Sequence, residues 1–278
     1  MHQRHLVDTT QLLHLHGTAG KTLQWFSNDM QASFEKNQHK VDPYYLNLDI
    51  NYNFNSAGYR TAEFDQYTPD QFFIAMGCSY TVGEGLLQAD RWSDQLSVHT
   101  GLPDMNLGVS GAGIDVIMFN SINYVNSDLP KPQFVVIQLP EITRRVEWYR
   151  QQEAESTSVY CEIAADSDSE FEQFYNEISQ SEASEIQITP AVNAAYYCEI
   201  IRHYWQSIGT PVYFWCFSGD ADTVKPYTDQ EVWSLPADYP DLIWPGDVAR
   251  DCAHDGKESN ATAAKIIHKH LMEKHHER

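Results

Sequence analysis

Three residues of the chain have the types and spacing for nucleophilic catalysis by a serine: Ser79, Asp251 and His254. Ser79 lies in residues 77–81, GCSYT, directly after an apolar run, and Asp251 and His254 are separated by three positions near the C-terminus. A serine hydroxyl is a weak nucleophile until a base takes its proton, and a histidine base works better when a carboxylate fixes its tautomer. One tight turn can bring the Asp251 carboxylate to one ring nitrogen of His254 while the other nitrogen faces the serine. The residue types therefore predict acyl transfer through Ser79.

Strands and helices alternate along the part of the chain that must position these residues. Short apolar runs predict buried strands, and amphipathic spacing predicts helices between them. The predicted strands are 72–76, 104–109, 134–140 and 211–217, and the predicted helices are 91–100, 114–125, 191–208 and 259–274. This alternation predicts an α/β fold, a parallel sheet with helices on both faces.

The same pattern predicts where the reactive groups meet. Ligands of such folds bind beyond the carboxyl ends of the strands. Ser79 and Gly111 each follow a predicted strand, so both are expected at one edge of the sheet. A glycine there lets the backbone approach a bound group closely, and a backbone N–H at such a turn suits a developing oxyanion.

Two further parts of the chain complete the predicted organisation. Residues 1–70 are interpreted as an extension packed on a core domain of residues 71–278, with a helix over 12–40 and strands and turns over 41–60. Residues 151–187 form an acidic insertion with ten carboxylates and no Lys or Arg. Apolar residues at helical spacing in it (Phe171, Phe174, Tyr175 and Ile178) favour one amphipathic helix packed on the domain. A mobile lid over the site is the alternative.

Composition limits the class of partner. The formal net charge of −21 disfavours nucleic acid, which is bound through Lys and Arg. No apolar segment has the length of a signal peptide or of a membrane span, and the five scattered cysteines do not resemble a disulfide framework or a CxxC zinc site. We therefore predict a cytoplasmic protein that acts on a small molecule, with virion association left open and no prediction of oligomeric state.

Three short blocks resemble those of the SGNH (GDSL-type) hydrolases. Residues 77–83, GCSYTVG, are similar to the family's first block, Gly-Asp-Ser-x-Thr-x-Gly, and residues 106–111, NLGVSG, to its second, Asn-x-Gly-x-Ser-Gly. Residues 251–256, DCAHDG, resemble its last block, Asp-x-x-His-Pro, and a predicted helix follows, as in the family. The resemblance spans residues 72–271. It implies a flavodoxin-like three-layer sandwich that acts on esters or thioesters without a metal or cofactor.

The resemblance also implies roles for individual residues. Ser79 would be the nucleophile, His254 the base and Asp251 its partner, with the backbone N–H groups of Ser79 and Gly111 forming the oxyanion hole. The predicted activity is hydrolysis of a carboxylic ester, with an acetyl group on a carbohydrate as one candidate. Two alternatives remain open: an O-acyltransferase, and a non-catalytic binding or structural module such as a virion component.

The chain departs from the family pattern in two places. Cys78 replaces the Asp that structures the nucleophile turn, and the third block, Gly-x-Asn-Asp, is absent after the third predicted strand. The Asn of that block donates to the oxyanion, so Thr143, Arg144 or Arg145 is expected to replace it. Upstream, Arg60 follows a predicted turn and is either a surface arginine or a residue that reaches the site to hold a carboxylate or brace a loop.

Other reactive side chains have simpler interpretations. The thiol of Cys78 needs less activation than a hydroxyl but is expected to point away from the site. Glu141 and Glu147 could form an acid/base pair for glycoside cleavage, although nothing in the sequence fixes their separation. The C-terminal histidines (His268, His270, His275 and His276) could suggest a metal site, but a solvated helix end explains them better.

Overall fold

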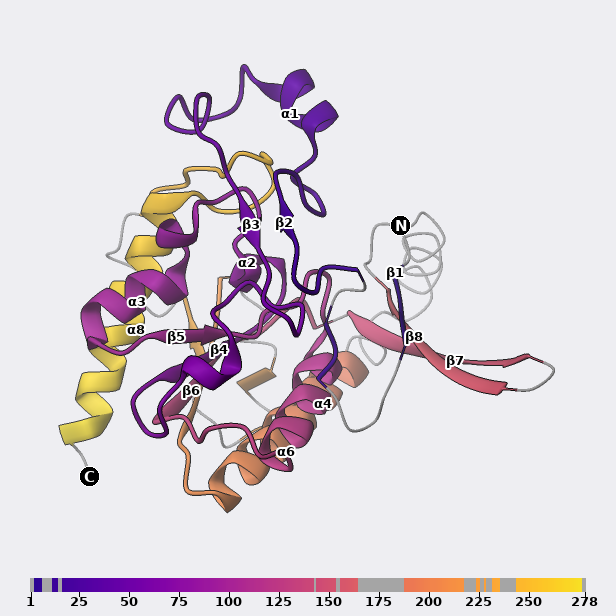
Figure 1. Ribbon diagram of the computed structural model, residues 1–278. Helices are drawn as coiled ribbons and strands as arrows, with labels where there is room; N and C mark the ends of the chain where they lie inside the picture. The colour runs from indigo at the N-terminus through magenta and orange to yellow at the C-terminus, as the bar shows by residue number, and fades with distance from the viewer. Residues whose placement is uncertain are drawn as a thin grey trace.

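The centre of the molecule is a sheet of five parallel strands in the order β10-β9-β6-β4-β5. Figure 1 labels β4, β5 and β6 of this sheet. The computed structural model describes residues 3–6, 12–14, 17–142, 144–153, 156–164, 188–217, 224–225, 228, 232–235 and 244–276. The strands of the sheet are β4 (Phe73–Met76), β5 (Asp104–Asn106), β6 (Phe134–Gln138), β9 (Val212–Cys216) and β10 (Val232–Ser234). Every residue of β4 and β6 is buried, as expected of central parallel strands covered on both faces.

Helices cover both faces of this sheet. The helices are α3 (Trp92–Thr100), α4 (Ile114–Val125), α6 (Ile188–Ser207) and α8 (Lys257–His276). Helix α3 packs against α8, and α4 packs against α6 (Figure 1). Successive strand residues point to opposite faces, so Phe73 contacts the cluster with α3 and α8, whereas Ile74 belongs to the cluster with α4 and α6. The predicted three-layer α/β sandwich is therefore confirmed.

The strand order creates a switch point beside β4. The chain passes from β4 to β5 on one side and then returns to β6 on the other side of β4. A crevice at such a reversal, beyond the carboxyl ends of the strands, is where flavodoxin-like sheets bind ligands. The short helix α2 (Ser79–Val82) begins directly after β4, so the topology places Ser79 at this point.

Some predicted boundaries differ from the structure. Strand β5 ends at Asn106 instead of residue 109, because the chain turns away where Gly108 packs on the backbone of α2. Strand β10 was missed, since three buried residues give too short a pattern to detect. The other predicted strands and helices correspond to β4, β6, β9, α3, α4, α6 and α8.

The predicted helix over residues 12–40 is wrong. Only α1 (Gln31–Asn37) is helical among the described residues of that range, and β2 (Thr22–Leu23) pairs with β3 (Tyr52–Asn53). Turns at positive φ interrupt the segment, among them Gly20 and Ser27. The apolar side chains of this range differ in burial: Leu13 and Phe26 belong to the larger core cluster, whereas Met30 is exposed. A 3-10 turn, η1 (Phe64–Gln66), precedes β4.

A hairpin begins where the third family block would stand. Strand β7 (Arg145–Glu153) pairs with β8 (Ser156–Ala164), and β1 (Gln3–Leu6) adds a third antiparallel strand (Figure 1). The first part of the predicted acidic insertion is therefore strand. Its predicted helix at Phe171–Ile178 lies outside the described residues. Among the described helices, none has both the length and the apolar character required to cross a bilayer.

Candidate active site

The turn that presents Ser79 depends on close contact between backbone and side chains. A Cβ on Gly77 would lie 2.1 Å from Oγ1 of Thr81 and 2.7 Å from Oε1 of Gln138, so only glycine fits there. Ser79 then opens α2, and the N–H groups of Gly83 and Glu84 donate back to the Ser79 carbonyl oxygen at 2.9 and 3.2 Å. The hydroxyl is thus held on a rigid element at the carboxyl end of β4.

His254 accepts a hydrogen bond from the hydroxyl of Ser79. Its Nε2 lies 2.7 Å from Ser79 Oγ, although the two residues are 175 positions apart in the chain. His254 lies in a loop before α8, where the N–H of Ala249 donates to the His254 carbonyl oxygen at 2.9 Å. The ring of Tyr80 packs edge-on against the imidazole at a centroid distance of 4.6 Å, which restricts its rotation.

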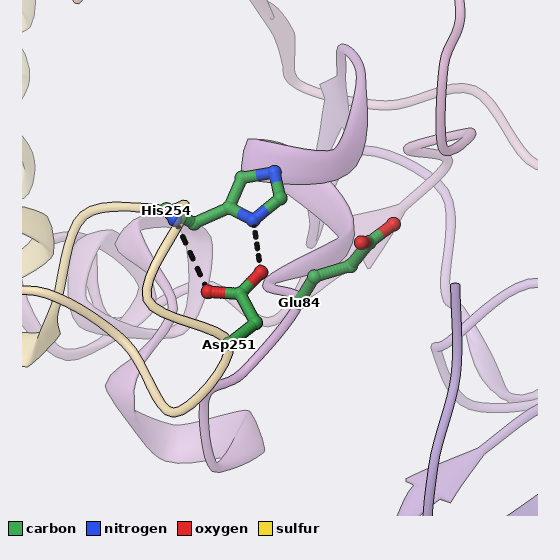
Figure 2. A group of neighbouring side chains, drawn as sticks. All are labelled: Glu84, Asp251 and His254. Atoms are coloured by element: carbon green, nitrogen blue, oxygen red, sulfur yellow. Dashed lines mark hydrogen bonds and ion pairs between the residues drawn. The ribbon is translucent and has the colours of Figure 1, made fainter. Parts of the chain in front are cut away.

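Asp251 fixes the tautomer of His254 (Figure 2). One carboxylate oxygen accepts the N–H groups of Ala253 and His254, both at 3.1 Å, and the other accepts the Nδ1–H of the imidazole. Because a carboxylate can only accept, the proton is on Nδ1, and Nε2 is free to receive the proton of Ser79. The three predicted residues are therefore joined in one hydrogen-bonded chain.

The charges in this group reinforce one another. Burial lowers the pKa of His254, but the hydrogen bond and charge of Asp251 together with the charge of Glu84 raise it by more, so this pKa lies above its ordinary value. Burial raises the pKa of Asp251, yet the hydrogen bonds and the charge of His254 bring it below its ordinary value. A base with a raised pKa becomes neutral, and so able to take a proton, at a higher pH than an ordinary histidine does.

Gly111 lies in the loop after β5, next to the nucleophile helix. The loop is held by Asn106, whose Nδ2 donates to the Thr81 carbonyl oxygen at 2.6 Å and whose Oδ1 accepts the Gly108 N–H at 3.0 Å. Gly111 has φ +74°, which favours glycine, and within the described residues no acceptor is bonded to its N–H or to the N–H of Ser79. Both predicted oxyanion donors are therefore available.

Gln138, which the sequence analysis missed, replaces the turn-forming role expected of the family's Asp. Its Oε1 accepts the N–H and the thiol of Cys78 and the hydroxyl of Thr81, each at 3.3 Å. The thiol of Cys78 is buried and directed toward Gln138, so it does not face His254. A polar residue closing the otherwise apolar run of β6 was the signal for Gln138.

Thr143, Arg144 and Arg145 are the predicted replacements for the Asn of the missing third block, and the structure describes the side chain of Arg144 alone. Thr143 and the side chain of Arg145 lie outside the described residues. Residues 107–113, between β5 and α4, contain Gly111 and are called the oxyanion loop here. Arg144 lies against this loop: a Cβ on Gly113 would be 2.4 Å from the Arg144 carbonyl oxygen. The Arg144 side chain is 20 % exposed, its Nε is 3.7 Å from a carboxylate oxygen of Glu141, and that Nε has no hydrogen-bond partner in the described part of the chain. Its positive charge also acts on the pKa of His254, in the lowering direction.

Arg60 is buried and donates to backbone oxygens, so its interpretation as a surface arginine is wrong. It is 2 % exposed, and its guanidinium donates to the carbonyl oxygens of Val82, Gly83 and Leu86 at 3.1, 2.7 and 2.9 Å. The planar, five-donor guanidinium suits several converging carbonyl oxygens. Arg60 therefore braces the loop after the nucleophile helix from beneath, the loop-bracing role that the sequence left open.

A buried carboxyl, Glu84, lies beside the predicted residues and was missed. One ligand atom each of Glu84, Asp251 and His254 lie within 4.8 Å of one another (Figure 2). Each of these side chains already makes hydrogen bonds, so the group does not need an ion to satisfy it. Among the described residues it is the only group of three or more His, Cys, Asp or Glu side chains with this proximity, and neither His268 nor His270 belongs to it.

Two of the C-terminal histidines pack on neighbouring rings. His268 stacks on His99 at 5.5 Å, and His270 stacks on Trp233 at 4.2 Å. His268 and His270 are thus packed on rings instead of simply solvated. The side chain of Glu147 is outside the described residues, while Glu141 is 51 % exposed and beside Arg144.

Comparisons with known proteins find similarity at the level of solved structures. No protein-family model matches the chain, and no curated protein is similar to it. One similar structure, from Desulfitobacterium hafniense DCB-2, is assigned to the G-D-S-L family of lipolytic proteins. It is 10 % identical with a TM-score of 0.42, over 72 % of this chain and 98 % of that one. The esterase AlinE4, of the SGNH-hydrolase family, is 16 % identical with a TM-score of 0.35, over 74 % of this chain and 99 % of that one. These two similar structures are thus a lipolytic protein of the G-D-S-L family and an esterase of the SGNH-hydrolase family.

Proposed function

We propose that the protein is a divergent SGNH-type serine hydrolase that cleaves a carboxylic ester. The observation that carries the proposal is the hydrogen-bonded chain Ser79–His254–Asp251 at the carboxyl end of β4. Its support includes the predicted fold, the three sequence blocks and the switch-point location of Ser79. An acetyl ester of a carbohydrate is the first substrate class to test.

The proposed reaction proceeds in two halves. The Oγ of Ser79 attacks the ester carbonyl carbon while its proton passes to Nε2 of His254, and Asp251 stabilises the resulting imidazolium. The tetrahedral intermediate then breaks, and its alcohol leaves with the proton from His254. In the second half His254 takes a proton from water, which attacks the acyl group on Ser79, and the acid departs as the proton returns to Ser79. These steps require no cofactor.

The oxyanion would be bound by the N–H groups of Ser79 and Gly111. In this proposal Arg144 supplies the further donor that the family obtains from the Asn of its third block. Its support is its place after β6, its contact with the oxyanion loop and its Nε, which has no hydrogen-bond partner among the residues that the structure describes. Glu141 at 3.7 Å holds the guanidinium only loosely, so the side chain can turn toward a bound substrate.

The first test is intact-mass analysis after treatment with a fluorophosphonate. We expect one adduct on the wild-type protein and none on Ser79→Ala, because only an activated serine attacks phosphorus at a measurable rate. Cys78→Ser is the matched control, since that residue adjoins Ser79 but faces Gln138, and it should still be labelled. Circular dichroism would show that each variant is folded.

The other outcomes separate the alternatives. A folded wild-type protein that takes no adduct would contradict the hydrolase and favour a non-catalytic module. Labelling combined with acyl transfer to an added alcohol in preference to water would identify an O-acyltransferase that uses the same site.

Replacement of Arg144 tests its proposed role. Arg144→Met is expected to lower the rate of ester hydrolysis by about 10²–10³-fold, the usual cost of one oxyanion donor. Arg202→Met is the control, because Arg202 lies on α6 and pairs there with Glu199. Hydrolysis of a chromogenic short-chain ester measures both. A loss smaller than about threefold would exclude Arg144 as a donor.

A further inference from the structure

Glu84 is a buried carboxyl that the proposed reaction does not use. It lies in the loop after α2, five positions after Ser79, and its side chain is 0 % exposed. Burying a carboxyl is costly unless hydrogen bonds or charges compensate for the lost water. Its contacts therefore indicate what it does.

The carboxyl of Glu84 joins three segments of the chain. One oxygen accepts the hydroxyl of Ser110, the residue before Gly111, and the other accepts the Asn28 N–H at 3.1 Å. Glu84 itself belongs to the segment that begins with the nucleophile. The carboxyl thus ties the oxyanion loop and the N-terminal segment to the loop that follows Ser79.

The same carboxyl lies beside the base. Figure 2 shows Glu84 next to Asp251 and His254, and one oxygen or nitrogen of each lies within 4.8 Å of the others. The negative charge of Glu84 acts in the direction that raises the pKa of His254, as that of Asp251 does. Burial raises the pKa of Glu84 itself, against the opposing effects of His254 and Ser110.

The other groups that face His254 come from separate elements. Tyr80 on α2 packs on its ring, Arg144 after β6 lowers its pKa, and Asp255 lies on its own loop. Glu84 is the carboxyl that reaches His254 from the nucleophile side.

We propose that Glu84 is a positioning residue of the Ser79–His254–Asp251 site, holding Gly111 in place through Ser110 and presenting a second carboxylate to His254. This inference rests on the proposed function. When Ser79 gives up its proton, the imidazolium that forms has two carboxylates beside it, and the N–H of Gly111 is already in position for the oxyanion. Preorganised charges and donors of this kind stabilise a transition state without reorganisation.

Glu84→Gln removes the negative charge of this side chain but keeps its hydrogen bonds. The amide oxygen can accept the Asn28 N–H, and the NH₂ can donate to Ser110 Oγ, so both contacts persist while the charge is lost. We expect the midpoint of the His254 titration, followed by proton NMR of the ring, to fall by about one pH unit. The His254 signal is assigned by its absence from His254→Ala. The acid limb of the fluorophosphonate labelling rate should move to lower pH by the same amount.

Ser110→Ala removes the hydrogen bond between Glu84 and the oxyanion loop but keeps the carboxyl of Glu84 and its charge. At a pH where His254 is neutral, we expect labelling about tenfold slower, because a small displacement of a reacting group is costly. The titration midpoint of His254 should stay at its wild-type value.

The chain contains a matched control. Glu63 also accepts one serine hydroxyl and one backbone N–H, both from Ser56, at 2.6 and 2.8 Å, but it is at the surface and outside the site. Glu63→Gln should change neither the midpoint nor the labelling rate.

The outcomes distinguish this inference from the proposed function. If Glu84→Gln leaves the His254 midpoint unchanged and Ser110→Ala is labelled at the wild-type rate, Glu84 is not a positioning residue, although labelling of the wild type would still support the hydrolase. If the wild type is not labelled, the hydrolase proposal fails. The NMR midpoint then still decides whether Glu84 acts on His254.

Discussion

Asp251→Asn is expected to lower the rate of ester hydrolysis and of Ser79 labelling by about 10⁴-fold at neutral pH. The carboxylate of Asp251 accepts the Nδ1–H of His254, which leaves Nε2 to receive the proton of Ser79. An asparagine amide would donate to Nδ1 instead and place the proton on Nε2, where it blocks the transfer from the serine. Second-order labelling rates and ester turnover measure the effect.

The control for this substitution is Asp255→Asn. Asp255 lies four positions further on, and its carboxylate accepts the Trp244 indole N–H at 3.5 Å instead of a ring nitrogen of His254. It should therefore retain most of the wild-type rate. If Asp251→Asn lost less than about tenfold, Asp251 would not be the partner of the base.

Asp29→Asn is expected to lower the free energy of unfolding by about 3–5 kcal/mol, the range for breaking a buried ion pair. The side chains of Asp29 and Arg250 are 0 % and 5 % exposed. Arg250 Nε donates to Asp29 at 3.0 Å, and the hydroxyl of Tyr52 donates to it at 2.6 Å. An asparagine would leave the guanidinium buried without a counter-charge. Urea denaturation gives the free energy.

Two comparisons test the reason for this loss. Asp70→Asn breaks a solvent-exposed pair, with Lys131 at 3.9 Å, and should cost less than about 1 kcal/mol. Combining Asp29→Asn with Arg250→Met should recover part of the stability, because no unpaired charge is then buried. If the double variant were no more stable than Asp29→Asn, the loss of stability would not come from the buried charge of Arg250.

The Asp29–Arg250 pair also links the N-terminal segment to the site. Arg250 precedes Asp251, and its N–H donates to the Gly85 carbonyl oxygen at 3.1 Å. The Gly85 N–H in turn donates to the Tyr52 hydroxyl at 2.7 Å. The loops of the nucleophile and of the base are thus joined to residues upstream of the first core strand, so loss of stability in Asp29→Asn should be accompanied by slower labelling of Ser79.

The sequence by itself determined the fold class and brought forward Ser79, Gly111, Asp251 and His254. Those signals are local: apolar runs for buried strands, glycines where the chain turns, and an aspartate three positions before a histidine. Because carboxyl ends of parallel strands share one edge, local signals were enough to expect Ser79 and Gly111 together. The same local approach failed over residues 12–40, where apolar spacing suggested a helix but turns at Gly20 and Ser27 prevent a continuous helix.

Only the tertiary structure decided which polar residues support the site. The hydrogen bonds that decide this join residues far apart in the chain. Glu84 and Ser110 are separated by 26 positions, Cys78 and Gln138 by 60, and Arg250 and Asp29 by 221. In sequence, a buried glutamate and a surface glutamate are identical, and Arg60 is equally compatible with a substrate contact and a brace. The difference lies in the partners, because a buried polar group persists only where distant segments supply its hydrogen bonds. Those partners exist only once the chain has folded.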